Sequence, residues 1–325
     1  MDPKYHALLD PVYLDYALEV ERTSASSNGD ISVQRQNYND SWRRHEPPLP
    51  ETLRHEDFTV IARDQGEIPI RCYYNDSPTT NPRLTVYLHG GGWVLGNLDS
   101  HDAICADISR NCASHVVAVD YRLAPENPFP TPLYDCIDAI KALLDTPEKY
   151  RLDYQSVVLS GDSAGANMAA ASCLNGVLEP LRIDGLMMIY PGLGASDNLA
   201  SFRENEFAPI LPYQALKAFF LAYIGGDENN TTPLTSPLLA GDVSSIPPCY
   251  ISAANHDPLR DDAIEFARKL ETQAIPCIVS LEENLGHGYL RVRHHSDAAG
   301  EAFRNCCQAV LQMHERCFPT KISAG

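Results

Sequence analysis

Apolar residues along the chain alternate between short continuous runs and longer stripes with helical spacing. The runs are short enough to be buried strands and lie at residues 83–88, 116–119, 156–160, 185–190, 249–253 and 277–281. The stripes with helical spacing lie at residues 133–144, 164–178, 261–272 and 296–313. Such alternation predicts an α/β fold with a mostly parallel central sheet and helices on both faces. Residues 58–63 and 68–74 are expected to add an antiparallel edge.

The first 50 residues follow a different pattern. Over residues 9–20 apolar side chains recur with the spacing of an amphipathic helix, and residues 31–45 predict a second, weaker helix after a polar loop at residues 23–30. The members of the stripe are Leu9, Val12, Tyr13, Tyr16 and Val20. Because an amphipathic helix needs an apolar surface to lie on, we expect residues 1–50 to form a helical lid over the main domain.

The main domain is predicted at residues 51–191 and 247–325, interrupted by an insertion at residues 192–246 that contributes to the lid. The insertion is rich in Pro, Thr, Asn and Gly and contains one clear helix. One face of this helix carries Leu216, Phe219, Phe220 and Tyr223. Packing in the core is the default interpretation of such a face, and lining of a substrate pocket is the alternative.

Composition narrows the range of partners. The 25 Lys and Arg residues against 43 Asp and Glu residues give a formal charge of −18, which disfavours nucleic acid and anionic membrane surfaces as partners. No signal peptide or membrane-spanning run is visible. The ten cysteines lack zinc-site spacing, so we expect buried thiols in a cytoplasmic protein without a bound metal.

A strand meets a helix without a loop at Gly161-Asp162-Ser163-Ala164-Gly165. The glycines permit the tight turn that lifts the central serine clear of the backbone, as the Gly-x-Ser-x-Gly geometry of a nucleophile requires. The first N–H groups of the following helix, including that of Ala164, would face the Ser163 hydroxyl and could stabilise a developing anion there.

A glycine-rich loop, His89-Gly90-Gly91-Gly92-Trp93, follows another strand. The unshielded N–H groups of Gly91 and Gly92 are candidate oxyanion donors opposite Ala164, and His89 is expected to make a structural hydrogen bond. The spacing of Gly91 and Gly96 also resembles a phosphate-binding loop, but Asn97 stands where that motif requires lysine, so we reject this interpretation.

His287 is the preferred base among the histidines. It follows the last predicted strand and is flanked by glycines, as suits a loop side chain that reaches over the sheet edge toward a nucleophile. His294 and His295, which lie beside Arg291 and Arg293 in the sequence, are expected at an exposed helix start.

Asp257 is the candidate third member, because it lies between Ser163 and His287 in the chain and directly follows a predicted strand. Asp261 and Asp262 fall in the first turn of the next helix, where the helix N-terminus explains carboxylates without any catalytic role.

Five motifs that follow one another along the chain resemble the hormone-sensitive-lipase-like family of α/β-hydrolases, and the run at residues 92–102 looks especially like bacterial acetyl esterases. The motifs are His89-Gly90-Gly91-Gly92-Trp93, Tyr121-Arg122-Leu123-Ala124-Pro125-Glu126, Gly161-Asp162-Ser163-Ala164-Gly165, Asp257-Pro258-Leu259 and His287-Gly288-Tyr289. The resemblance implies an α/β-hydrolase fold with Ser163 as nucleophile, Asp257 and His287 as its partners, and Gly91, Gly92 and Ala164 as oxyanion donors.

The function that this resemblance implies is a serine carboxylesterase acting on short acyl esters through an acyl-enzyme, with a small-molecule ester and water as reactants and no cofactor. An amidase or a deacetylase of a specialised substrate would use the same residues. A non-catalytic small-molecule receptor is a remote alternative, because the plant gibberellin receptors that resemble this family have lost the histidine, whereas His287 is present here.

Overall fold

The central sheet of the computed structural model has eight strands in the described part of the chain, which comprises residues 2–24, 29–75, 81–178, 183–194 and 198–319. Their order is β1-β2-β4-β3-β5-β6-β7-β8. The strands are β1 (Arg54–Ile61), β2 (Glu67–Tyr74), β3 (Arg83–Leu88), β4 (His115–Val119), β5 (Ser156–Asp162), β6 (Gly185–Ile189), β7 (Cys249–His256) and β8 (Cys277–Gly286). The pairs β1–β2 and β2–β4 are antiparallel and the other pairs are parallel, so the predicted fold class is confirmed.

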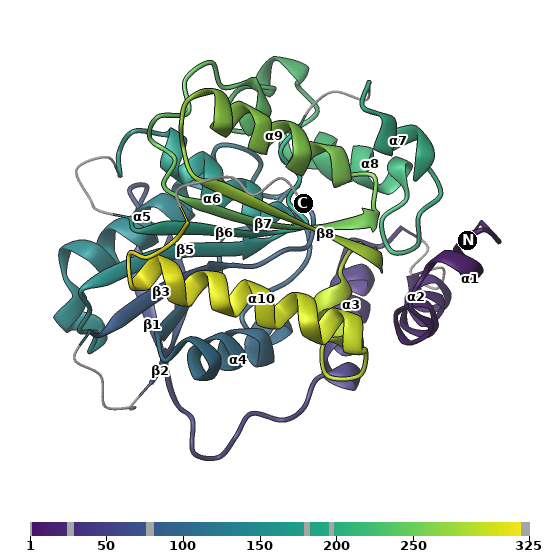
Figure 1. Cartoon of the computed structure of the whole chain (residues 1–325). Coiled ribbons are helices and arrows are strands. Elements are labelled where there is room, and N and C mark those ends of the chain that lie inside the picture. The colour runs from purple at the N-terminus through teal and green to yellow at the C-terminus, as the bar shows by residue number, and fades with distance from the viewer. Residues whose placement is uncertain (1, 25–28, 76–80, 179–182, 195–197, 320–325) are drawn as a thin grey trace.

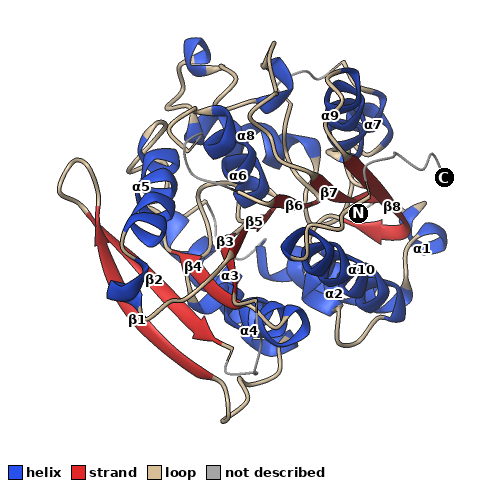
Figure 2. Ribbon diagram, turned by 60° about the vertical axis from the view of Figure 1, so that its left-hand side comes forward, coloured by secondary structure: helices blue, strands red, loops and turns tan. Residues whose placement is uncertain are grey.

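Helices cover both faces of this sheet (Figures 1 and 2). The α-helices in the described part of the chain are α1 (Tyr5–Leu8), α2 (Pro11–Ser24), α3 (Ile31–His45), α4 (Asp102–Cys112), α5 (Thr131–Asp145), α6 (Ala164–Leu174), α7 (Ala200–Glu204), α8 (Tyr213–Tyr223), α9 (Arg260–Thr272) and α10 (Asp297–His314). Short 3-10 helices lie at Asp99–His101, Pro147–Tyr150, Glu228–Asn230, Pro237–Leu239 and Tyr289–Val292. Figure 2 shows α4 and α10 on one face and α5, α6 and α9 on the other.

Each face of the sheet has its own apolar core. On β3, Leu84, Val86 and Leu88 belong to the core under α5, α6 and α9, whereas Tyr87 belongs to the core under α4 and α10. A central parallel strand is buried on both faces, which explains why these strands form continuous apolar runs in the sequence.

The elements differ from the prediction in several places; for example, β1 spans Arg54–Ile61 instead of residues 58–63. Helix α4, in which eight of eleven residues are buried, was not predicted. Helix α6 ends at Leu174 instead of residue 178, since Gly176 with φ 78° follows the end of the helix. Strand β8 continues to Gly286 and therefore delivers His287 directly.

The N-terminal helices α1, α2 and α3 lie at the end of the sheet toward which β7 and β8 point (Figure 1). Helix α3 occupies the predicted residues 31–45, and the Asp30 side chain accepts hydrogen bonds from the Ser32 and Val33 amides at its start. Of the predicted apolar stripe, Val12 is instead 36% exposed, while Leu14 and Ala17 are buried. Of the polar loop predicted at residues 23–30, residues 25–28 lie outside the described part of the chain.

The sequence predicted buried cysteine thiols and no membrane-spanning segment. All ten cysteines are free thiols, nine of them buried, and Cys317 is exposed, contrary to expectation. Within the residues that the structure describes, no helix is both long enough and apolar enough to cross a membrane.

Candidate active site

Ser163 occupies a strained turn between β5 and α6. Its backbone has φ 52° and ψ −118°, a region that non-glycine residues seldom adopt. A side chain at Gly165 would collide with the main-chain oxygen of Leu88, and one at Gly161 would collide with the backbone of Gly165. The two glycines therefore allow β3, β5 and α6 to meet closely enough to hold the turn.

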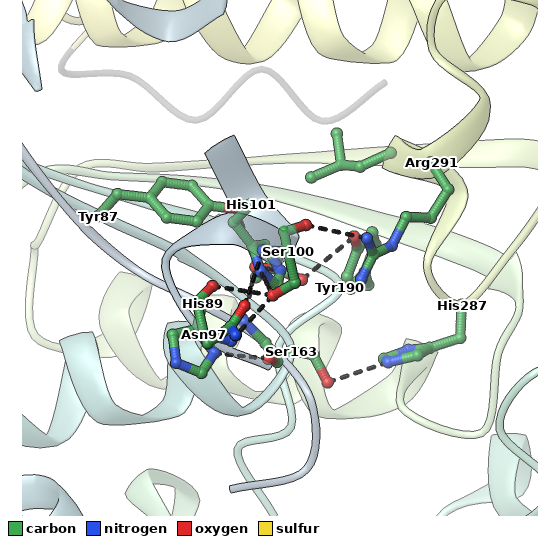
Figure 3. A network of polar contacts seen from close by, with 12 residues as sticks. Tyr87, His89, Asn97, Ser100, His101, Ser163, Tyr190, His287 and Arg291 are labelled. Atoms are coloured by element: carbon green, nitrogen blue, oxygen red, sulfur yellow. Dashed lines mark hydrogen bonds and ion pairs between the residues drawn. The ribbon is translucent and has the colours of Figure 1, made fainter. Parts of the chain in front are cut away.

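The structure brings Ser163, His287 and Asp257 together (Figure 3 labels the first two). The Ser163 hydroxyl oxygen lies 2.9 Å from Nε2 of His287, and Nδ1 of His287 lies 2.7 Å from Oδ2 of Asp257. The other carboxylate oxygen of Asp257 accepts the amide of Leu259 at 2.9 Å. Because Asp257 is 1% and His287 7% exposed, this line of hydrogen bonds is shielded from water.

The three predicted oxyanion residues lie around Ser163. Gly91, Gly92 and Ala164 line the same cavity as the hydroxyl, and Ala164 is the first residue of α6. Gly91 and Gly92 have φ values of 126° and 62°, and a side chain at Gly92 would collide with the ring of Phe219. Glycine is thus required at both positions for the loop to present its backbone to the cavity.

Asp162, the residue before the serine, has a role that the sequence analysis missed. Its buried carboxylate accepts the amide of Gly90 at 2.8 Å and the hydroxyl of Tyr87 at 2.8 Å. Burial opposes ionisation, but the nearby His101 and the Tyr87 hydroxyl outweigh it and hold the pKa of Asp162 well below its usual range. An ionised Asp162 therefore fixes the start of the glycine loop against the nucleophile turn.

A column of buried side chains connects Asp162 to the N-terminal helices, and Figure 3 labels two of its members, His101 and Arg291. Nε2 of His101 lies 3.4 Å from Asp162, and the Trp42 ring of α3 lies 4.2 Å from the His101 ring, centroid to centroid. The Arg291 guanidinium lies against Trp42 and donates to the Ser100 carbonyl at 3.1 Å. The N-terminal helices and the catalytic centre thus share one buried network.

His294 and His295 are exposed, as predicted, whereas the neighbouring Arg291 and Arg293 are buried. Arg291 and Arg293 are 2% and 5% exposed. Arg293 forms ion pairs with Asp107 and with Glu46, which directly follows α3. Burial lowers the pKa of Arg291, as expected of a cation removed from water.

His89 makes the structural contacts expected of it. Its Nδ1 lies 2.8 Å from the Gly90 carbonyl oxygen, and its ring stacks on Tyr121 with the centroids 4.2 Å apart. Burial lowers the pKa of His89 to about 3, so the imidazole is neutral and supports the glycine loop without adding charge.

A cavity of about 550 Å³ contains the site and is lined partly by α2 and α3. The aromatic face of α8 divides between the two interpretations left open by the sequence. Leu216 and Phe219 line the cavity, whereas Tyr223 stacks on Trp93 at 4.5 Å and Phe220 contacts the same ring edge-on. One side of α8 therefore shapes the pocket and the other anchors the helix.

For the two carboxylates at the start of α9, the sequence predicted only an interaction with the helix N-terminus. The structure shows that they also bind main-chain amides of another segment. Asp262 is fully buried and accepts the amides of Leu193 and Gly194 at 2.8 and 2.7 Å. Asp261 accepts the amide of Ser201 at 2.8 Å. Both carboxylates therefore hold the segment that follows β6 against the catalytic domain, and burial raises the pKa of Asp262 to about 7.

Comparison with known proteins identifies the class. The model of the alpha/beta hydrolase fold family matches residues 85–291, and this chain belongs to that family, which confirms the resemblance found in its motifs. Among curated relatives, it is 38% identical to the carboxylesterase NlhH of Mycobacterium tuberculosis over 79% of this chain and 82% of the relative. It is 32% identical to the ethyl acetate hydrolase of Pseudomonas putida, with the same two coverages.

Solved structures agree with this assignment. The hyperthermophilic esterase from the archaeon Pyrobaculum calidifontis superposes with a TM-score of 0.84 at 28% identity, over 94% of this chain and 99% of that one. The carboxylesterase EstE1, cloned from a metagenomic library, gives a TM-score of 0.81 at 28% identity over 89% and 99% of the two chains.

Replacing Asp162 by alanine should reduce kcat/KM by about 100-fold, because the glycine loop loses the carboxylate that holds Gly90. Ester hydrolysis by purified protein measures this effect. Asp138→Ala is the matched control, since Asp138 also accepts a backbone amide, that of Arg63 on the far edge of the sheet, and should leave kcat/KM within about two-fold of wild type. Equal activities of the two variants would contradict this role for Asp162.

Asp262→Asn should change how stability depends on pH. The folded pKa of Asp262, about 7, lies above the ordinary value of 3.8, so the folded state binds the proton more tightly and wild-type stability falls as pH rises from about 4 to about 7. The variant lacks this titration. Urea unfolding should therefore show the variant gaining stability relative to wild type over this range, with a constant difference above it. Parallel curves would rule out a raised pKa.

Proposed function

We propose that the chain is a serine carboxylesterase that hydrolyses short-chain acyl esters through an acyl-enzyme at Ser163. Its class, a carboxylic ester hydrolase, follows from the family and from curated relatives named as esterases. The single observation that supports the mechanism is the unbroken line of hydrogen bonds from Asp257 through His287 to Ser163.

In the proposed mechanism, Nε2 of His287 takes the proton from Ser163 as the hydroxyl oxygen attacks the ester carbonyl. The backbone N–H groups of Gly91, Gly92 and Ala164 stabilise the oxyanion of the tetrahedral intermediate. His287 then protonates the departing alcohol. Water enters, loses a proton to His287 and attacks the acyl-enzyme, which releases the acid and restores Ser163.

Asp257 orients the imidazole in this scheme. Its carboxylate beside Nδ1 favours the tautomer in which Nε2 is free to accept a proton, and it stabilises the imidazolium that forms during attack. The amide of Leu259 holds the other carboxylate oxygen, so the acceptor stays directed at the ring.

We further propose that residues 1–50 act as a lid, that residues 51–191 and 247–325 form the catalytic domain, and that the insertion at 192–246 completes the lid. Lining of the cavity by α2, α3 and α8 supports this division. A cytoplasmic location is proposed from the free thiols, because disulfides are rare in reducing compartments.

The short-chain preference is proposed from the walls of the cavity. Phe219 lies directly beside Gly92 at the oxyanion loop, and Leu216, one helical turn earlier, also lines the cavity. Bulky side chains so close to the reacting carbonyl limit the length of an acyl chain that can be accommodated. The relative named ethyl acetate hydrolase is consistent with a small acyl group.

Ser163→Ala should lower kcat by on the order of 10⁴-fold or more while the protein stays folded, because only the nucleophilic hydroxyl is removed. Asp257→Asn should cost on the order of 10⁴-fold by favouring the wrong imidazole tautomer. Hydrolysis of p-nitrophenyl acetate and circular dichroism measure both properties. Asp261→Asn, four residues further on, is the control and should remain active; if it is the inactive variant, Asp261 and not Asp257 is the partner of His287.

The acyl-chain profile tests the substrate. On p-nitrophenyl esters, kcat/KM should peak between acetate and butyrate and fall sharply by octanoate, and Phe219→Ala should move the peak to longer chains, since each added methylene that fits contributes about 0.8 kcal/mol. Phe220→Ala is the matched control, because the neighbouring ring packs against Trp93 and its loss should leave the profile unchanged. A wild-type preference for decanoate would refute the short-chain proposal without affecting the triad.

A further inference from the structure

The first turn of α2 contacts the main chain that carries His287. The hydroxyl of the fully buried Tyr13 donates a hydrogen bond to the carbonyl oxygen of His287 at 2.8 Å. The same ring covers Gly286 so closely that a side chain there would collide with it. Just before α2, the amide of Asp10 donates to the carbonyl oxygen of Asn284 at 2.8 Å. The N-terminal segment is thus bonded to the end of β8 at two points.

Helix α1 reaches the other partner of the nucleophile through one intermediate residue. The Tyr5 hydroxyl donates to Oδ1 of Asn205 at 3.3 Å, and Nδ2 of Asn205 donates to the carbonyl oxygen of Asp257 at 3.2 Å. Tyr5 and Asn205 are both buried. The main-chain carbonyls of both Asp257 and His287 are therefore held, directly or indirectly, by tyrosine hydroxyls of the first 13 residues.

The position of β8 in the sheet explains why His287 needs such support. Strand β8 is the last in the strand order and pairs with β7 alone, and that ladder ends at His256 and Gly286. His287 is the next residue, and Gly288 with φ 75° follows it in a turn. The hydrogen bonds of the imidazole fix the ring but not the backbone from which it projects. A displacement of about 1 Å in a reacting group can cost about 100-fold in rate.

We propose that Tyr13 is a positioning residue for His287, and that the N-terminal segment braces the catalytic base as well as covering the pocket. This inference rests on the proposed role of His287. The Tyr13 hydroxyl holds the His287 carbonyl so that Nε2 stays within hydrogen-bond distance of Ser163 while Nδ1 stays on Asp257. In the described structure Tyr13 bonds the His287 carbonyl and does not line the cavity, so its effect is exerted through the base.

Tyr13→Phe removes only the hydroxyl and keeps the buried ring, so the fold should survive. With p-nitrophenyl butyrate, kcat should fall by about 10-fold while KM changes by less than two-fold, because the deleted bond supports the base and not the substrate. Inactivation by phenylmethylsulfonyl fluoride also requires an activated Ser163, and its rate should fall in the same proportion as kcat.

Tyr74→Phe is the matched control. Tyr74 is a buried tyrosine on β2 whose hydroxyl donates to the carbonyl oxygen of Tyr150 at 3.0 Å, so the same chemical group is deleted at a distance from the site, and kcat should stay within two-fold of wild type. Urea unfolding of both variants measures the loss of stability that they share.

His287→Ala separates this inference from the proposed function. If His287→Ala keeps wild-type activity, the proposed base is wrong. If His287→Ala is inactive but Tyr13→Phe keeps wild-type kcat, or raises KM with kcat unchanged, the base stands and the brace is overturned. A drop in kcat for Tyr13→Phe that Tyr74→Phe reproduces would also overturn it, since the effect would then follow from stability alone.

Discussion

The close approach of α6 to β3 is the constraint on which the catalytic end of this molecule depends. Gly165 lies so near the Leu88 carbonyl that no side chain fits between them, and in the sheet Leu88 pairs with Gly161. This contact forces Ser163 into a positive φ, and the surrounding structure has to offset that strain. It also brings the glycine loop that follows Leu88 beside the nucleophile, so the oxyanion donors and the hydroxyl that they serve are placed by one packing interaction.

The sequence was sufficient to predict the parts of this arrangement that are encoded locally. Buried strands appear as apolar runs, and a strand that leads directly into Gly161-Asp162-Ser163-Ala164-Gly165 has few alternatives to a tight turn. Asp162 was overlooked because its variable place in the motif carries no local signal, and its partner Gly90 lies 72 residues away. The exposure of His294 and His295 was predicted correctly. The burial of the nearby Arg291 against Trp42 of α3 depends on tertiary packing that no local pattern contains.

The N-terminal segment shows the same limit in another form. Its apolar periodicity predicted an amphipathic helix and a covering role, and periodicity reports only which face avoids water. The periodicity predicted that Val12 is buried, but Val12 is exposed. It also could not reveal that the Tyr13 hydroxyl bonds the His287 carbonyl and that the Tyr5 hydroxyl is connected through Asn205 to the Asp257 carbonyl. Tyrosine combines a large apolar ring with one polar atom. The tyrosines of the N-terminal segment can therefore cover the site with their rings and hold its main chain with their hydroxyls.

A charged group supports the oxyanion loop, whereas neutral groups support the catalytic base, and electrostatics explains the difference. On the oxyanion side the support is the ionised Asp162, whose negative charge would oppose an oxyanion forming beside Ser163. Three features reduce that opposition: the hydrogen bonds of Tyr87 and Gly90, the nearby His101, and the buried Arg291 guanidinium, whose positive charge also lowers the pKa of Asp162. On the base side the supports are neutral hydroxyls. The imidazole of His287 must both accept and release a proton in each half of the reaction. A neutral donor can fix the His287 backbone without adding a charge that would alter the proton affinity of this imidazole.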